Sequence, residues 1–138
     1  VHLVKSIMTS EPITVTENTP VHEAMRIIVD NAIAGLPVVD EKGVLLGMIT
    51  EKDMLQLMYR SNLGGMAVAD IMTHDIVIFV PDDDVNLVCQ CLMEHTFKRV
   101  PITSEGRVVG VVSRRDIIRF IMDLAAWGES INPNAPMI

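Results

Sequence analysis

The sequence predicts an α+β fold built from two tandem copies of one unit, each with the element order β-α-β-β-α, packed around a pseudo-two-fold axis. Two observations support this prediction. Motifs recur along the chain at a nearly constant spacing, and each copy shows the same succession of β-rich segments, helical apolar periodicity and glycine-containing turns. A unit of about 50 residues has a sheet face that it cannot cover alone, so the two copies should pack as one body.

The internal repeat is readable residue by residue. The segment Val4 to Thr9 is similar in sequence to Val68 to Thr73, and Leu36-Pro37-Val38 is similar to Val100-Pro101-Ile102. Both pairs have a spacing of 64 residues. After a one-residue deletion the spacing is 63, which aligns Gly43, Gly47, Thr50 and Asp53 with Gly106, Gly110, Ser113 and Asp116. We therefore expect a first copy over residues 1–60, a linker over 61–67, a second copy over 68–128 and a loose tail over 129–138.

Each copy should begin with a short strand followed by a helix. The strands are predicted at Ile13–Val15 and Val77–Phe79, where β-branched and aromatic residues cluster. Thr19 followed by Pro20 predicts a helix cap and first turn, and Asp82-Asp83-Asp84 does the same in the second copy. Three adjacent aspartates also suggest a metal site, but acidic residues are favoured at a helix start by the backbone dipole, so capping is the preferred interpretation.

A hairpin and a second helix complete each copy. The hairpins are predicted at Leu36–Val39 with Leu45–Ile49, and at Val100–Thr103 with Val108–Val112. The apolar residues expected on the second helices are Met54, Leu55 and Met58 in one copy and Ile117, Ile118, Ile121 and Met122 in the other. The last helix should run to Trp127 and stop at Gly128.

Composition narrows the class of protein. The printed sequence has no apolar run near the roughly 20 residues of a membrane span and no secretory leader pattern, so a cytoplasmic protein is expected. The net charge of −7 argues against a broad basic face for nucleic acid. Six of the eleven basic residues nevertheless cluster late in the chain, as either a phosphate site or a salt-bridged surface: Lys98, Arg99, Arg107, Arg114, Arg115 and Arg119.

The strand-to-helix junctions carry the candidate chemistry. In both copies glycine and two apolar residues precede a hydroxyl residue, two variable positions and an aspartate: Gly47 to Asp53 and Gly110 to Asp116. One interpretation is a capping box, in which hydroxyl and carboxylate satisfy backbone amides. The other is a nucleotide site, because a helix start offers amides to a phosphate and a carboxylate can accept hydrogen bonds from ribose hydroxyls.

Taken together, these duplicated motifs resemble the cystathionine β-synthase (CBS) domain pair over roughly residues 4 to 122. The resemblance implies composite pockets between the copies, each holding an adenosine nucleotide (AMP, ADP or ATP) or a related adenosyl compound as a regulatory ligand. One pocket would use Ile13, Thr14, Ile33 and Ala34 with Ser113, Arg114, Arg115 and Asp116. The mirror pocket would use Val77, Ile78, Phe97, Lys98 and Arg99 with Thr50, Lys52 and Asp53.

By the same resemblance the aspartates hold ribose hydroxyls, the hydroxyl and basic side chains hold phosphate, and backbone near Ile13 and Val77 reads adenine. We expect a non-enzymatic sensor, because no nucleophile with its base is apparent and the four histidines are scattered. The resemblance further implies a homodimer of pairs that signals to an effector protein in trans. The alternatives are a structural or dimerising module without ligand, a nucleic-acid binder, and an enzyme.

Overall fold

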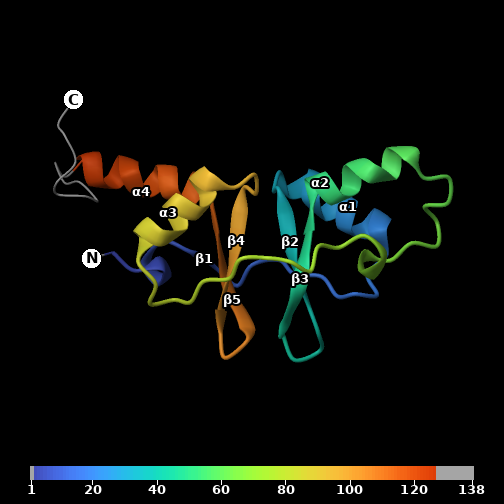
Figure 1. Ribbon diagram of the computed structural model, residues 1–138, viewed down its shortest axis with the longest axis horizontal. Coiled ribbons are helices and arrows are strands. Elements are labelled where there is room, and N and C mark those ends of the chain that lie inside the picture. The colour runs from blue at the N-terminus through green and yellow to red at the C-terminus, as the bar shows by residue number, and fades with distance from the viewer. Residues whose placement is uncertain (1, 127–138) are drawn as a thin grey trace.

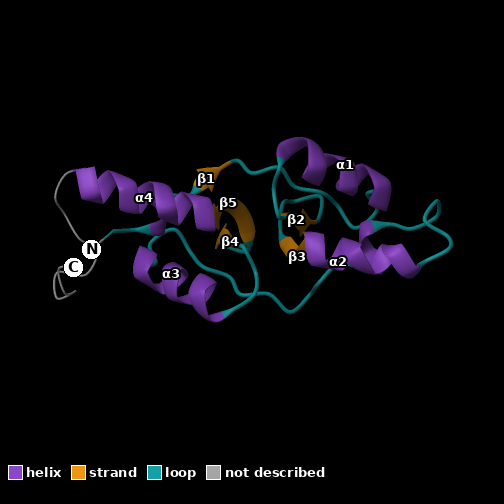
Figure 2. Cartoon of the chain, turned by 90° about the horizontal axis from the view of Figure 1, so that it is seen from above, coloured by secondary structure: helices purple, strands orange, loops and turns teal. Residues whose placement is uncertain are grey.

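The computed structural model describes residues 2–126. Two β-hairpins lie side by side in the centre of an elongated molecule, and each is flanked on its outer side by a pair of helices (Figure 1). Seen from above, α3 and α4 pack at one end and α1 and α2 at the other (Figure 2). This arrangement agrees with the predicted pseudo-symmetric α+β fold. The predicted end of the last helix at Trp127 and the predicted tail lie outside the described residues.

The element order is the same in the two copies. The first copy contains α1 (Val21–Asn31), β2 (Gly35–Val39), β3 (Leu45–Thr50) and α2 (Glu51–Leu55), which continues into a 3-10 turn (Gln56–Tyr59). The second contains α3 (Val85–Glu94), β4 (Arg99–Ser104), β5 (Arg107–Ser113) and α4 (Arg114–Ala126). Both hairpins are antiparallel, with Leu36 opposite Ile49 and Val100 opposite Val112.

The two copies exchange their N-terminal segments. Strand β1 (Thr9–Ser10) precedes the first copy in sequence but pairs with β5 of the second, with Thr9 opposite Val111. The equivalent segment of the second copy pairs with the first copy, where Thr73 and Met48 exchange backbone hydrogen bonds of 2.8 and 2.9 Å. Each hairpin is therefore completed by a segment from the other copy.

The hairpin tips also meet. The Leu45 amide donates to the Gly106 carbonyl (2.9 Å) and the Val108 amide donates to the Gly43 carbonyl (3.0 Å). Gly43 and Gly106 have φ values of +83° and +79°, a conformation that favours glycine. These reciprocal bonds fasten the copies together at the end of the hairpins opposite to α2 and α4 (Figure 1).

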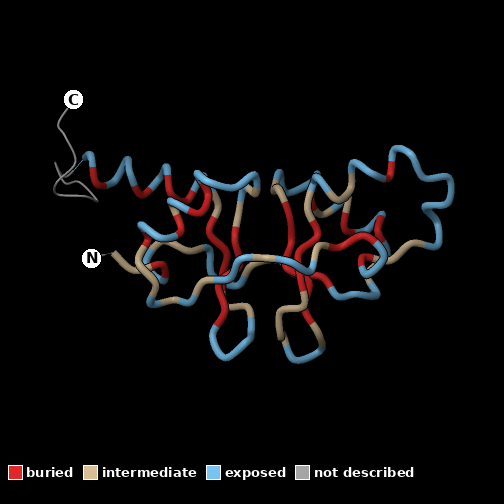
Figure 3. The backbone as a smooth tube through the Cα atoms, in the orientation of Figure 1, coloured by how far each residue is buried: buried red, intermediate tan, exposed pale blue. Residues whose placement is uncertain are grey.

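Two hydrophobic clusters form the core, and each includes residues from the exchanged segment. Val4 packs with Val85, Val100 and Phe120 in one cluster, and Val68 packs with Val21 and Leu36 in the other. Burial is concentrated on the central strands and on the inner faces of the helices, as the red segments of Figure 3 show. Neither copy has a complete core without the other's N-terminal segment.

The predicted first strands are shorter than expected. Only Val15 and Phe79 pair, as single parallel bridges to Val38 and Ile102. The next ladder bond would require an amide hydrogen from Pro37 or Pro101, which proline lacks, so the pairing cannot extend to residue 13 or 77.

The helix starts and apolar faces also correct the prediction in places. Thr19 does not cap α1 with its side chain, since its hydroxyl accepts instead from the Thr16 amide (3.0 Å). Asp84 does cap α3, by accepting from the Asn86 amide (2.9 Å). Leu55 and Met58 are exposed, and the helix tightens into a 3-10 turn after Leu55. Ile118, Ile121 and Met122 are exposed as well, and the residues of α4 that face the core are Ile117, Phe120 and Leu124.

Across residues 2–126 no helix combines the length and the apolar character that crossing a membrane requires.

Candidate functional site: a cavity between the two copies

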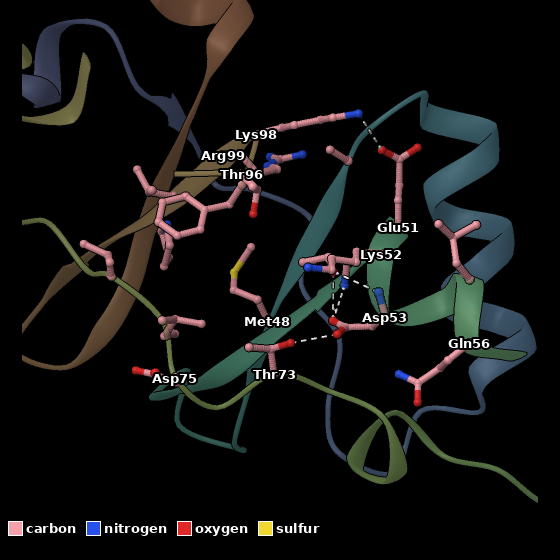
Figure 4. A pocket seen from close by; sticks show the side chains of 18 residues that line it. Met48, Glu51, Lys52, Asp53, Gln56, Thr73, Asp75, Thr96, Lys98 and Arg99 are labelled. Carbon is pink, nitrogen blue, oxygen red and sulfur yellow. Dashed lines mark hydrogen bonds and ion pairs between the residues drawn. The ribbon is translucent and has the colours of Figure 1, made fainter. Parts of the chain in front are cut away.

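A cavity of about 500 Å³ lies between the copies and is walled by both of them. The first copy contributes α2 and the end of β3, and the second contributes the segment before β4 (Figure 4). The walls are formed by Ala34, Met48, Thr50, Glu51, Lys52, Asp53, Leu55, Gln56, Thr73, Asp75, Ile76, Val77, Thr96, Phe97, Lys98, Arg99, Val100 and Pro101. The two-copy arrangement thus brings carboxylates, cations and apolar side chains together around one space.

The Thr50–Asp53 junction is a capping box at the start of α2. The Asp53 Oδ2 atom accepts from the Thr50 amide (2.9 Å) and the Thr50 hydroxyl (2.9 Å), and the Asp53 amide donates to the Thr50 Oγ1 atom (3.2 Å). The Glu51 amide donates to the Ala34 carbonyl (2.9 Å). Three of the four amides from residue 50 to 53 therefore have partners within the chain. Fewer backbone amides are free than the sequence predicted, so an anion bound here would be held mainly by side chains.

Thr73 reaches the same carboxylate from the other copy. Its hydroxyl donates to the Asp53 Oδ1 atom over 2.7 Å (Figure 4). A carboxylate has about four lone-pair positions, and the three donors on Asp53 leave about one for a ligand hydroxyl. Thr73 was not among the residues predicted for this site, although the duplicated Met-Thr dipeptide is a signal for it. Thr9, its equivalent, also approaches an aspartate of the other copy, Asp116 (3.4 Å).

Three cationic side chains line the cavity, namely Lys52, Lys98 and Arg99. The Lys98 Nζ atom lies 3.6 Å from the Glu51 carboxylate, an ion pair that joins the two copies across the cavity (Figure 4). The Arg99 Nε atom is buried and has no hydrogen-bond partner among the described residues. Burial lowers the pKa of the Arg99 guanidinium, and nearby Asp116 partly opposes that shift.

The Ser113–Asp116 junction forms the same capping box, but its carboxylate is buried and its acceptor positions are already occupied. Asp116 is 6% exposed, whereas Asp53 is half-buried. Its carboxylate accepts from the Ser113 amide (2.8 Å), the Ser113 hydroxyl (3.1 Å), the Thr9 hydroxyl (3.4 Å) and Arg119 (3.2 Å). These four donors match the capacity of a carboxylate, so a ligand hydroxyl would have to displace one of them.

The structure separates the predicted residues into two sets. Thr50, Lys52, Asp53, Val77, Phe97, Lys98 and Arg99 line the cavity together, and so does Ala34, for which the resemblance implied a place beside Ser113. Ile78 is 47% exposed and is not among the lining residues. Ile13, Thr14, Ile33, Ser113, Arg114, Arg115 and Asp116 line neither this cavity nor a second one of about 530 Å³ beside Thr16 and Asp40.

Potential metal ligands are dispersed in the described part of the chain. No three His, Cys, Asp or Glu side chains between residues 2 and 126 come close enough together to hold an ion. Of the three adjacent aspartates before α3, Asp82 pairs with Lys5 (3.0 Å), Asp83 accepts from the Val80 amide (2.8 Å) and Asp84 caps the helix.

Comparison with curated proteins finds relatives in which a region similar to this chain is part of a longer protein. L-Aspartate semialdehyde sulfurtransferase of Methanocaldococcus jannaschii is 33% identical over 118 residues, which are 85% of this chain and 23% of that protein. The chain spans less than half of the length of the first curated relatives that it matches, 42% and 23%.

Solved structures match over nearly their whole length. The CBS domain pair of protein MJ0100, in complex with 5-methylthioadenosine and S-adenosyl-L-methionine, superposes with a TM-score of 0.78 at 31% identity, covering 89% of this chain and 98% of that one. CBSX2, a CBS-pair protein of Arabidopsis thaliana, in complex with AMP gives a TM-score of 0.83 at 25% identity, covering 91% and 99%.

The CBS domain family itself matches residues 4–60 and 68–123. These two matches fall on the two copies of the repeat and confirm the resemblance seen in the duplicated motifs. The chain belongs to the CBS domain family and carries two tandem CBS domains.

Proposed function

We propose that the cavity beside Thr50 and Asp53 binds an adenosine-bearing ligand and that the chain acts as a regulatory module rather than as an enzyme. The observation that carries the proposal is the meeting of Asp53 with Lys52, Lys98 and Arg99 around one cavity of about 500 Å³. The two similar domain pairs described above hold adenosyl ligands, AMP in one and S-adenosyl-L-methionine with 5-methylthioadenosine in the other.

Each part of such a ligand has a counterpart in the cavity. The remaining acceptor position of Asp53 suits a ribose hydroxyl, and a second hydroxyl would displace Thr73. The ammonium groups of Lys52 and Lys98, with Arg99 in the same wall, suit an anionic group. Val77 and Phe97 provide apolar surface for a base.

The Ser113–Asp116 junction is proposed as the weaker of the two predicted sites. Its carboxylate already has four donors and is almost fully buried, so binding there carries the cost of breaking internal hydrogen bonds. As the ligand concentration rises, the Asp53 cavity should therefore fill before any site beside Asp116.

A ligand that touches both copies favours the arrangement of the copies that it fits best. That difference in affinity shifts the population of arrangements, which an effector protein bound in trans would detect. A homodimer of pairs and a cytoplasmic location belong to the same proposal. The competing function is a structural or dimerising module whose cavity takes no ligand.

Calorimetric titration with AMP, ADP, ATP, S-adenosyl-L-methionine and 5-methylthioadenosine tests the proposal. Asp53→Asn should weaken the ligand that binds wild type by about ten- to a hundredfold, because a charge-assisted hydrogen bond is lost. Asp30→Asn makes the same charge change on the exposed face of α1 and should leave the affinity unchanged. Absence of binding to wild type by all five compounds would favour the structural module, and equal affinities of wild type and Asp53→Asn would remove this carboxylate from the site.

A further inference from the structure

The ion pair between Glu51 and Lys98 is placed to compete with a ligand. Three ion pairs occur within residues 2–126, and this one alone has both members in the wall of the cavity. Glu51 is the first residue of α2, and Lys98 directly precedes β4 of the other copy. Figure 4 shows the two side chains extending toward one another from the two copies.

The ion pair is weak enough to open. Its atoms are 3.6 Å apart, and the side chains of Lys98 and Glu51 are 60% and 52% exposed. Exposed ion pairs of this kind add little to folding stability, because water screens the attraction and ordering two long side chains costs entropy. An incoming anion can therefore take Lys98 without a large penalty to the fold.

Releasing Lys98 leaves the Glu51 carboxylate unpaired beside the bound anion. Two like charges a few ångströms apart repel each other even in a water-like medium. Glu51 therefore lowers the affinity for a phosphate in two ways. It occupies Lys98 before the ligand binds, and its carboxylate repels the bound phosphate. A ligand without charge at that end meets neither effect, and a cationic ligand would be attracted.

The other junction has no such competitor. Arg114 takes the place of Glu51 in the second copy, and Ala34 takes the place of Lys98 in the first. Glu51 takes no part in the capping box, which consists of Thr50 and Asp53, and its backbone amide donates instead to the Ala34 carbonyl (2.9 Å). Its carboxylate can be neutralised without removing a hydrogen bond of the fold.

We infer that Glu51 sets the charge preference of the proposed site, by lowering its affinity for phosphate-bearing adenosyl ligands relative to uncharged ones. The inference rests on the proposed function, because it assumes that an adenosyl ligand enters this cavity. It assigns a residue that decides between AMP and an uncharged compound such as adenosine or 5-methylthioadenosine.

Calorimetric titration of Glu51→Gln with AMP and with adenosine tests this assignment. The substitution keeps the side-chain shape and removes the charge, so AMP should bind about three- to tenfold more tightly than to wild type while adenosine binds as before. Glu41→Gln is the matched control, because it changes net charge equally at an exposed position in the turn between β2 and β3, the end of β3 away from Glu51. It should leave both affinities unchanged.

A double-mutant cycle identifies the partner. In a Lys98→Met background, Glu51→Gln should keep only the part of its effect on AMP that comes from repulsion, because no ammonium remains to be released. An undiminished gain without Lys98 would overturn the competition for Lys98 and leave repulsion as the whole effect. An equal gain for AMP and adenosine, or the same gain in Glu41→Gln, would overturn the inference while leaving the proposed function intact. Failure of wild type to bind any of the adenosyl compounds would overturn both.

Discussion

Replacing Gly47 by alanine tests the contact that holds the two copies together beside the cavity. A Cβ atom at Gly47 would lie 2.5 Å from the Thr73 carbonyl oxygen and 2.6 Å from the Met72 Cε atom. The methionine methyl group can move, but the carbonyl oxygen is fixed because it accepts from the Met48 amide (2.9 Å) and the Thr73 amide donates back (2.8 Å). The substitution must therefore push the exchanged segment away from β3.

The expected cost follows from these distances. Overpacking a closely packed contact costs about 1–3 kcal/mol, and weakening two backbone hydrogen bonds adds about 1 kcal/mol. We expect Gly47→Ala to lower the free energy of unfolding by about 2–4 kcal/mol, which is roughly a 10 °C fall in Tm for a chain of this length. Ligand affinity should fall as well, because the displaced segment continues to Ile76 and Val77 in the cavity wall.

Two other glycines calibrate the measurement. At Gly110 the closest atom to an added Cβ is the Met8 sulfur at 2.6 Å, which is flexible, and the nearest backbone atom is the Thr9 oxygen at 3.0 Å. Gly110→Ala should therefore cost about 1–2 kcal/mol. Gly64 has nothing within 4 Å, so Gly64→Ala should change stability by less than about 1 kcal/mol.

Urea unfolding followed by circular dichroism, with thermal melting as a second measure, gives the three values. The predicted order of destabilisation is Gly47→Ala, then Gly110→Ala, then Gly64→Ala. A Gly47→Ala protein as stable as the Gly64→Ala protein would show that the close approach of Thr73 to β3 is not a constraint on the fold. It would also refute the stabilising role given to the exchanged segment.

Three further predictions concern buried groups. Asp116→Ala should destabilise the fold by about 2 kcal/mol, more than Asp53→Ala, because Asp116 is buried and four donors would lose their acceptor; urea unfolding that gives the reverse order would contradict this. A disulfide reagent should modify Cys89 about tenfold faster than buried Cys91 in the native protein and at similar rates after unfolding. Burial, with Glu94 nearby, raises the pKa of the Cys91 thiol, so its contribution to stability is complete below the ordinary thiol pKa and is lost as the pH rises through the raised value. Unfolding curves of wild type and Cys91→Ala should therefore converge at alkaline pH, and a constant difference would contradict the shift.

Much of the fold was predictable because its elements follow from local sequence patterns and because the same patterns occur in both copies. Helical apolar spacing, turn glycines and the duplicated Pro-containing strands placed both hairpins and both pairs of helices. The errors lie where tertiary contacts override local preference. Residues 13 to 15 have strand-forming side chains, but Pro37 has no amide hydrogen for residue 13, so only Val15 pairs. Leu55 and Met58 continue an apolar pattern but are exposed, and the helix tightens into a 3-10 turn after Leu55.

The exchanged segments could not be read from the sequence. Thr9 pairs with Val111 and Thr73 pairs with Met48, and neither contact leaves a local pattern, because backbone pairing between distant strands depends on where the other copy lies. This exchange also delivers Thr73 to Asp53, which explains why that residue escaped the prediction.

The sequence by itself determined that two equivalent hydroxyl-to-aspartate junctions exist and that both can close a capping box, since that motif needs only four consecutive residues. Only the tertiary structure decided how the two differ. Asp53 faces a cavity with cations from the other copy, whereas Asp116 is buried beneath Thr9 and Arg119. The reason is physical: capping is a short-range interaction within one turn, but solvent access and charge at a carboxylate depend on every element packed around it.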